Sequence, residues 1–298
     1  MSPLSGHTYP PARLRALCGL PPQALAQLCE AAVPVLLAAR HTAQAQRPGR
    51  KRAVGGGRRR GLQPEQEILL TLLYLRHNVA HEVVGALFGV SADTSENTFH
   101  EVVAVLPQVC PERRWDAQKR WQKGQPAWEP TDQDQVLIDS FETPVRRPSG
   151  DAAQRRVYSG KKKRHTLKTQ LVTDAQGEVL EIDAGHRGPT ADKTLYAQSA
   201  AATRYPHAAR WGDRGYQGTA GVQTPHKKPQ GGELTPEQRE ANRIHARLRV
   251  RVEHGVRRLK GFRILREDYR LAPGLFPRIA AVVVGLVHLV RLVGTASS

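Results

Sequence analysis

The sequence predicts an α/β protein, in which a mixed sheet is covered by helices and follows an all-α helix-turn-helix domain. Two observations lead to this fold class. Residues 136–185 contain three strand-like segments, and residues 191–260 then alternate between helix and strand patterns, as expected for a mixed sheet. Residues 62–106 follow a helical period instead, with one glycine turn inside it. A length of 298 residues fits one large domain and a smaller one.

Residues 1–61 are predicted to form a helical segment followed by a basic arm. One or two short helices fit the first 46 residues, where Pro21, Pro22 and Pro34 are expected to break them. The next stretch, RPGRKRAVGGGRRRG, places seven cations in a glycine-rich segment that cannot form a core. Two roles stay open for this arm: a solvated linker or a direct contact with phosphates.

Residues 62–110 carry the pattern of a helix-turn-helix domain. Pro64 suits the first turn of one helix, and a second helix fits residues 80–88. Gly89 can adopt a left-handed turn, and Ser91 can cap a third helix that runs to about residue 106. Such a helix pair places its second helix in a DNA major groove. The same pattern also occurs as a purely structural packing unit.

The start of the third helix is rich in small polar side chains. They are Ser91, Asp93, Thr94, Ser95, Asn97 and Thr98. These side chains have the size and hydrogen-bonding groups needed to reach base edges. We assign DNA contacts to Ser91, Thr94 and Asn97.

The remaining chain is divided into a linker, a large domain and a final helix. Residues 111–133 combine tryptophans with prolines and predict an irregular linker. Residues 134–272 form the large domain, with strands over 136–145, 164–174 and 178–185, a helix over 191–205, a short strand and glycine-punctuated loop over 207–218, and a long helix from the Thr235 cap to about Lys260. Residues 273–298 contain the apolar stretch 279–293, which predicts a buried core helix rather than a membrane span.

The charge balance points to a polyanionic partner. The chain has 45 Lys and Arg against 27 Asp and Glu, a formal net charge of +18. This excess favours nucleic acid over an anionic membrane surface. Three cysteines without paired spacing indicate neither a disulfide framework nor a zinc site, as in a reducing cytoplasm. The amino terminus lacks the apolar core of a signal peptide. We therefore expect a cytoplasmic, nucleoid-associated protein with no membrane partner.

Three carboxylates lie where metal chemistry is plausible. Asp139 is in the middle of a strand, where an ionised group must be paired, protonated or coordinated. Asp213 lies between Gly212 and Gly215, which would let the backbone approach a ligand closely. Glu253 is on the long helix. Three such acids suit Mg²⁺, and a metal pair can support phosphoryl transfer. Taken singly, Asp213 also fits a turn and Glu253 a surface salt bridge.

Two faces are expected on the long helix. The apolar stripe consists of Ile244, Leu248, Val252, Val256 and Leu259. Arg249, Glu253, Arg257 and Lys260 recur on a polar face beside it. One acid among aligned cations suits a surface that faces DNA phosphates.

Several blocks resemble the DDE transposases of bacterial insertion sequences, and most closely the IS-five group. They are IDSFETPVRRP, YSGKKKRHTLKTQLV, DKTLY, GDRGYQG, TPHKKPQGGELTPEQ and RVRVEHGVRRLKGFRIL, in the order of the family. The resemblance implies an RNase H-like fold for the mixed sheet. It also implies that Asp139, Asp213 and Glu253 are catalytic and hold Mg²⁺, for which Mn²⁺ can substitute. Asp192, in DKTLY, matches a further recurrent acid of the family.

The family signature Tyr-x₂-Arg-x₃-Glu-x₆-Lys aligns with Arg249, Glu253 and Lys260, while Ala246 stands at the tyrosine position. Phe141 is a second departure, because a smaller residue is common there. The resemblance implies that Arg249, Arg257 and Lys260 contact DNA. It implies terminal inverted repeats and target DNA as double-stranded partners, strand cleavage and strand transfer as the reaction, and a homo-oligomer on DNA. The alternatives are a domesticated, catalytically inactive DNA-binding protein and a nucleoid-coating protein.

Overall fold

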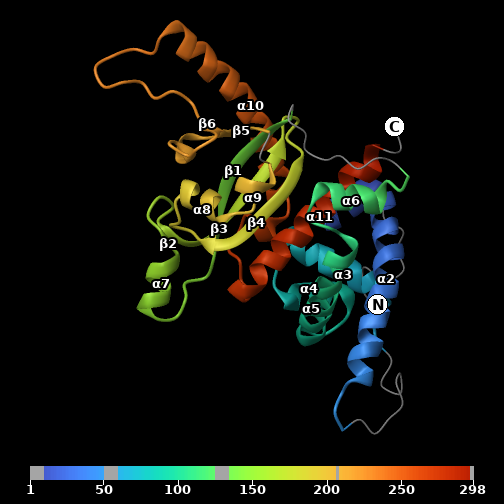
Figure 1. The fold of residues 1–298 in the computed structure, drawn as a ribbon. Helices are drawn as coiled ribbons and strands as arrows, with labels where there is room; N and C mark the ends of the chain where they lie inside the picture. The colour runs from blue at the N-terminus through green and yellow to red at the C-terminus, as the bar shows by residue number, and fades with distance from the viewer. Residues whose placement is uncertain (1–9, 50–59, 125–133, 206–207, 296–298) are drawn as a thin grey trace.

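A mixed sheet of six strands forms the large domain, as the sequence predicts (Figure 1). The computed structural model describes residues 10–49, 60–124, 134–205 and 208–295. Three antiparallel strands come first: β1 (Gln135–Pro144), β3 (Arg164–Asp174) and β4 (Val179–Arg187). Two short strands, β5 (Ala209–Gly212) and β6 (Val222–Gln223), continue the sheet parallel to β1, and β2 (Tyr158–Ser159) pairs with β3. This arrangement is that of an RNase H-like domain.

Both faces of the sheet are covered, so β1 is apolar on both sides. Leu137 and Phe141 point into the larger core, which they share with the helices of the amino-terminal region. Val136 and Ile138, on the opposite face, enter a smaller core with Tyr216. The alternation along one strand therefore decides which side of the sheet each residue serves.

The smaller core is covered by two short helices, α8 (Asp192–Gln198) and α9 (Ala201–Arg204), where the sequence predicts one helix. The break occurs at Ser199, whose backbone is extended. Its hydroxyl donates to the carbonyl of Tyr196 and accepts from the Gln170 amide, so a contact with β3 ends the first helix. The helix α7 (Asp151–Val157) and the two-residue strands are further elements that the sequence does not reveal.

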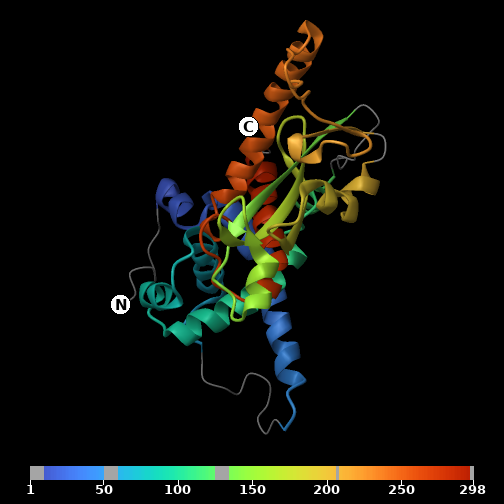
Figure 2. The same cartoon turned by 90° about the vertical axis from the view of Figure 1, so that its left-hand side faces the viewer.

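The long helix α10 (Pro236–Lys260) begins at the predicted Thr235 cap. Its carboxyl-terminal half packs on the sheet through Val252 and Leu259. Ile244 is 46% exposed, so the predicted apolar stripe is wrong for the first half of the helix. The reason is geometric: the first half of α10 projects beyond the sheet (Figures 1 and 2), and its contacts are made by Asn242 and His245 rather than by Ile244.

The amino-terminal region confirms the helix-turn-helix pattern. Its helices are α1 (Pro11–Cys18), α2 (Pro22–Ala45), α3 (Pro64–His77), α4 (His81–Phe88) and α5 (Ala92–Val109). Gly89 has a φ of 71°, and the Ser91 hydroxyl accepts a hydrogen bond from the backbone of Thr94. The expected break at Pro34 is wrong, because α2 continues through it. Buried residues on both sides of the proline, Ala24, Leu28, Ala32 and Leu36, hold the helix together.

The predicted irregular linker contains a helix, α6 (Arg114–Trp121), which packs on other elements of the core. Trp128, and residues 50–59 of the basic arm, lie outside the described residues. Arg60, from the same arm, forms ion pairs with Glu67 and Glu101. The Arg60 guanidinium is therefore already paired with carboxylates of the helical region.

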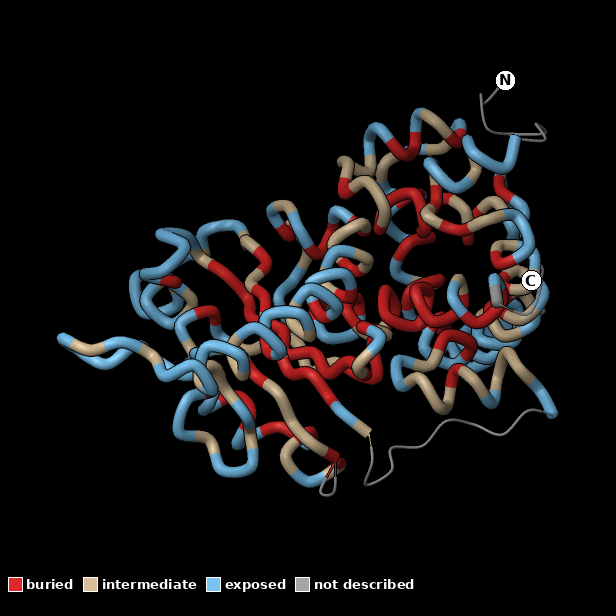
Figure 3. Tube along the Cα trace, turned by 90° about the horizontal axis from the view of Figure 1, so that it is seen from above, coloured by how far each residue is buried: buried red, intermediate tan, exposed pale blue. Residues whose placement is uncertain are grey.

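The last helix, α11 (Phe276–Thr295), is the buried core helix that the sequence predicts. It packs against β4 on one side and α5 on the other. His288 Nε2 donates to the Val179 carbonyl at 2.6 Å, and any side chain at Gly285 would collide with the backbone of Cys110. Buried residues occupy both the sheet and the helical region in Figure 3. One hydrophobic core thus joins the two parts.

Two helical segments are long and apolar enough to cross a membrane by length and composition alone: Pro22–Ala45 and Pro273–Gly294. The apolar window of the second is 72% buried inside the protein, as expected for a core helix. The window of the first is 22% buried, and its buried positions follow one stripe of α2.

Candidate active site

The parallel pairing of β1 with β5 brings two aspartates to one edge of the sheet. Ile138 lies opposite Gly212 in the register of these strands. The next residue on β1 is Asp139, and the next residue after β5 is Asp213. β5 ends at Gly212 while β1 continues to Pro144, so Asp139 and Asp213 lie side by side where the pairing of the two strands ends. The pairing could not be derived from the sequence, although both residues were singled out there.

Asp139 is held inside the site rather than in open solvent. Its Oδ1 accepts a hydrogen bond from the backbone of Ser140 at 2.8 Å. Burial raises the pKa of Asp139 to about 6, and this effect outweighs the Ser140 hydrogen bond and the charge of Arg249, which both lower the pKa. The nearby Asp213 and Asp192 carboxylates raise it further. Burial is therefore the main reason that Asp139 holds its proton more tightly than an ordinary aspartate does.

Asp213 caps the short 3₁₀ turn Arg214–Tyr216, with Oδ1 accepting from the backbone of Gly215 at 2.8 Å. A Cβ at Gly215 would collide with the carboxylates of Asp192 and Asp213, and one at Gly212 would collide with the ring of Tyr216. The two glycines were expected to admit a ligand. Instead, they leave room for these protein groups.

Asp192 lies beside Asp139 and is held by contacts with Ser140 and Lys168. Its Oδ1 accepts from the Ser140 hydroxyl at 2.6 Å and pairs with Lys168 Nζ at 3.1 Å. Lys168 also donates to the Thr190 carbonyl at 2.5 Å and is only 7% exposed. The pair ties α8 to β1 and β3 beside Asp139. Sequence reasoning missed Lys168, although a lone lysine inside an otherwise buried strand was a usable signal.

Glu253 lies on the solvent side of the same site, with its side chain 56% exposed. Arg249 stands between it and Asp213: one guanidinium nitrogen lies 3.6 Å from Asp213 Oδ2 and another lies 3.8 Å from Glu253 Oε1. Among the described residues, no three His, Cys, Asp or Glu side chains are close enough together to hold a metal ion. The three predicted ligands thus share a site, and a cationic side chain separates the third from the second.

The predicted DNA-binding residues fall in separate places. Lys260 lies over the ring of Phe141, 5.1 Å from its centroid, and burial lowers the pKa of Lys260. Arg257 is exposed on α10. Ser91, Thr94 and Asn97 are exposed at the start of α5.

Two other polar residues at the start of α5 cannot read bases as proposed. Ser95 and Thr98 are buried, at 0% and 2% exposure. They face the helical core because they lie on the opposite side of α5 from Asn97. Fewer polar residues at the start of α5 can therefore contact bases than the sequence pattern implies.

The residues at the edge fit a divalent cation on the chemistry of their donors. Asp139 and Asp213 supply carboxylate oxygens, which Mg²⁺ prefers. The raised pKa of Asp139 comes mainly from its burial, and the charge of Arg249 partly offsets that effect. Glu253 would complete the set only if Arg249 moved from between the carboxylates.

An RNase H-like sheet with two aspartates at its parallel edge defines a phosphoryl-transfer enzyme class. The chain belongs to the DDE superfamily of endonucleases: the family model described as DDE superfamily endonuclease matches residues 138–288. A second model, the helix-turn-helix of DDE superfamily endonuclease, matches residues 60–112. Both matches confirm the superfamily that the sequence blocks indicated.

Two curated proteins are similar over most of the chain. One, named as the probable transposase for insertion sequence element IS702 of Microchaete diplosiphon, is 33% identical over 220 residues, covering 72% of this chain and 76% of that protein. The other, provisionally named as the transposase for element IS112 of Streptomyces albus G, is 29% identical over 221 residues with the same coverage. No solved structure matches. The narrower IS-five assignment stays a prediction.

The raised pKa of Asp139 predicts a pH-dependent response to Mg²⁺. The folded-state pKa is about 6 against an ordinary value of 3.8, so the folded chain holds this proton more tightly. The associated stability is present below about pH 4 and is lost as pH rises through about 6, a loss on the order of 3 kcal/mol. Millimolar Mg²⁺ should raise the Tm by several degrees at about pH 7.5 and hardly at all at about pH 5.

Thermal unfolding of wild type, Asp139→Asn and the exposed control Asp151→Asn measures this response. Asp139→Asn should lose the Mg²⁺ effect and be more stable than wild type without Mg²⁺ at about pH 7.5. The control should behave as wild type. Equal Mg²⁺ effects at both pH values, or an unchanged response in Asp139→Asn, would contradict the assignment.

Proposed function

We propose that this chain is the transposase of a bacterial insertion sequence, acting on DNA in the cytoplasm. The observation that carries the proposal is the pair Asp139 and Asp213 at the parallel edge of an RNase H-like sheet. The names of the two similar proteins support it, since both are given as transposases of insertion elements. The helix-turn-helix of the same superfamily and the net charge of +18 supply the means to bind DNA.

The reaction is cleavage of DNA strands at the ends of the element, followed by transfer of those strands to target DNA. Asp139, Asp213 and Glu253 would hold Mg²⁺, or Mn²⁺ in its place. Such a cation supplies activation of the attacking oxygen and stabilisation of the leaving one. Asp139 is half-buried, and its contact with the backbone of Ser140 fixes the orientation of the carboxylate.

Arg249 is the residue whose role changes between states. Without DNA it offsets the charge of Asp213 and Glu253. If the carboxylates held divalent cations, the Arg249 guanidinium would be free to bind a phosphate, the contact that the family signature assigns to it. Lys260, one turn beyond Arg257, adds positive charge near β1.

Recognition of the terminal inverted repeats is assigned to the start of α5. Ser91, Thr94 and Asn97 are exposed there, although the Ser91 hydroxyl also caps the helix. Asn97 therefore has the most freedom to form base contacts. Joining two ends requires two active sites, so we expect a homo-oligomer on DNA.

The alternative of a catalytically inactive, domesticated protein rests on Phe141 and Ala246. Phe141 is 6% exposed, with its ring in the larger core under Lys260. Phe141 shares a face of β1 with Asp139, but its ring is packed into the larger core. Ala246 is exposed and removes one side chain that could touch DNA, without changing the carboxylates. Neither departure favours inactivity over catalysis.

The carboxylate assignment predicts that single isosteric changes abolish cleavage. Asp139→Asn and Asp213→Asn each remove a charged ligand without changing side-chain size. The rate of Mg²⁺-dependent nicking of a duplex carrying the end of the element should fall at least ~100-fold. Glu253→Gln should also lose activity, whereas the partly exposed α6 control Asp116→Asn should retain it. Wild-type cleavage rates in Asp213→Asn would eliminate the proposed mechanism.

Sequence recognition predicts a separate effect at α5. Deleting residues 62–106 would remove part of the shared core, so a point change is the cleaner test. Asn97→Ala should reduce the preference for end DNA over unrelated DNA by about 1–3 kcal/mol, while nonspecific binding keeps its salt dependence. Competition binding measures the preference, with Thr42→Ala on α2 as a control. A preference that survives in Asn97→Ala would remove that residue from the recognition surface.

A further inference from the structure

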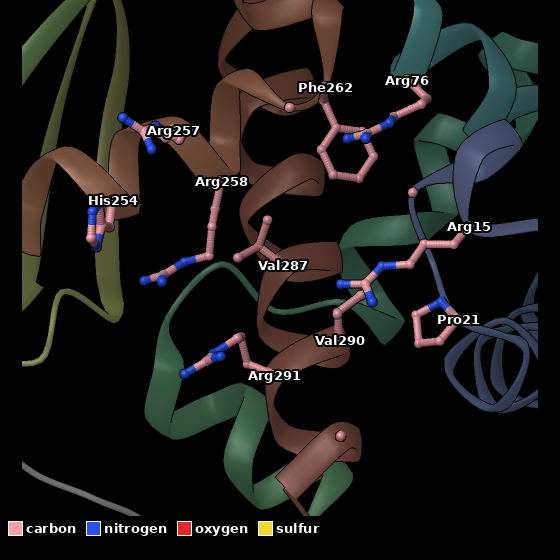
Figure 4. Close-up of a pocket in the computed structure, with 13 residues that line it drawn as sticks. Arg15, Pro21, Arg76, His254, Arg257, Arg258, Phe262, Val287, Val290 and Arg291 are labelled. Atoms are coloured by element: carbon pink, nitrogen blue, oxygen red, sulfur yellow. The ribbon is translucent and has the colours of Figure 1, made fainter. Parts of the chain in front are cut away.

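A large basic cavity lies between the helical region and the carboxyl-terminal half of α10. It has a volume of about 930 Å³ and is lined from α1, α3, α10 and α11. Its cationic residues are Arg15, Arg76, His254, Arg257, Arg258 and Arg291. Figure 4 shows Arg15 and Arg76 on one side, the α10 residues on the other, and Val287 and Val290 between them. The lining contains no carboxylate.

Two of its five arginines are already paired and build one wall. Arg291 binds the carboxylate of Glu178 through two nitrogens, at 2.6 and 3.0 Å. Arg258 lies 3.5 Å from the same carboxylate. Glu178, immediately before β4, is thus paired with arginines of both α10 and α11. Its negative charge is therefore not available to neutralise the other cations of the cavity.

The other three arginines, Arg15, Arg76 and Arg257, have no ion-pair partner within the described part of the chain. Arg76 is half-buried, with its guanidinium 5.5 Å from the centroid of the Phe262 ring. Burial lowers the pKa of Arg76, and the charge of Arg15 lowers it further, whereas Cys18 acts in the opposite direction. A partly buried cation beside other cations is unfavourable unless an anion joins it.

The chemistry of the lining selects a phosphate backbone as the anion. Arginine donors and an apolar floor are present, but no Asn, Gln, Ser, Thr, Asp or Glu side chain lines the cavity. Arginine can read guanine, but the other bases are read by such side chains, whereas phosphates need only donors and positive charge. The cavity therefore fits a sequence-independent contact with nucleic acid.

Its position relative to the carboxylates sets where on the DNA that contact would fall. On α10 the cavity lining runs from His254, next to Glu253, to Gly261, which lies beside the Arg76 guanidinium. Gly261 is eight residues from Glu253 on the helix, or about 12 Å. One strand of a duplex rises 3.4 Å per phosphate, so the Arg76 end of the cavity is roughly three or four nucleotides from Glu253. On its other side, the cavity is bounded by α1 and by α3, the helix that precedes the helix-turn-helix pair.

We propose that this cavity is a second phosphate-binding site, which holds the DNA backbone between the recognised sequence and the cleaved bond. The proposal rests on the proposed transposase function for the identity of the DNA. It assigns Arg15 and Arg76, which no sequence motif marks, to the DNA-binding surface. It also gives Arg257 a defined location on the DNA.

The test compares salt dependence of binding to end duplex without divalent cations, so that no cleavage occurs. Arg76→Gln and Arg15→Gln should each reduce the slope of log K against log salt by about one, and weaken binding roughly fivefold to tenfold near 0.1 M salt. Arg76→Lys should keep the slope. Arg278→Gln, at the opposite end of α11, removes the same charge and should weaken binding much less. Unchanged slopes in both Arg76→Gln and Arg15→Gln would overturn the proposal. Arg15 is exposed, so Arg15→Gln still tests the site if Arg76→Gln impairs folding.

A neutral methylphosphonate placed at each linkage in turn locates the contact. Wild type should be weakened by a neutral linkage roughly three or four nucleotides from the scissile bond, and Arg76→Gln should not respond there. If a neutral linkage weakened binding equally in wild type and Arg76→Gln, Arg76 would contribute only diffuse charge, and the proposed site would be wrong. ATP serves as a probe for a free-nucleotide site: Arg76-dependent ATP binding with an unchanged DNA slope would replace the DNA assignment. The binding measurements test the cavity and do not depend on cleavage. The transposase proposal is tested separately, by whether the wild type nicks end DNA.

Discussion

The parallel pairing of β1 with β5 is the constraint on which the site depends. It aligns Ile138 with Gly212, and so sets Asp139 beside Asp213 at one edge of the sheet. The strands keep this register because β1 is packed on both faces. His245, on α10, donates from Nε2 to the Gly212 carbonyl at 2.8 Å and fastens the end of β5 to the helix that carries Glu253. A slip of one residue would reverse the face of every side chain on the strand.

Helix α11 connects this chemistry to recognition. It is packed between β4 and α5, so the helix-turn-helix region and the sheet share a core instead of being joined by a flexible tether. In the proposed function, DNA bound by α5 would be presented to the carboxylates at a fixed spacing. The basic cavity lies at the same junction, between α3 and α10. Recognition, backbone binding and cleavage would then be three positions along one DNA strand.

Much of this fold follows from local sequence. The alternation in VLIDSFETPV, the turn before Gly177 and the Thr235 cap predict β1, the hairpin and α10, because each depends on neighbouring residues. The three carboxylates were singled out by their positions in the sequence and assigned as a catalytic triad by resemblance, whereas the proximity of Asp139 to Asp213 could not be derived from pattern. The break at Ser199, the Lys168 pair and the placement of Arg249 all depend on residues distant in sequence. The exposed Ile244 illustrates the same limit: periodicity predicts a face, but not whether a partner surface exists.

The central claim is that Asp139, Asp213 and Glu253 bind one cation cluster when Arg249 yields its place. Replacing Mg²⁺ by Fe²⁺ and adding peroxide and ascorbate generates hydroxyl radicals that cut the polypeptide beside the bound ion. With end DNA present, the account predicts cuts at three separate places, next to Asp139 in β1, at the turn after β5 and near Glu253 in α10, and all three should be suppressed by excess Mg²⁺. Cuts confined to other parts of the chain, or cuts at the two aspartates with none in α10, would contradict it.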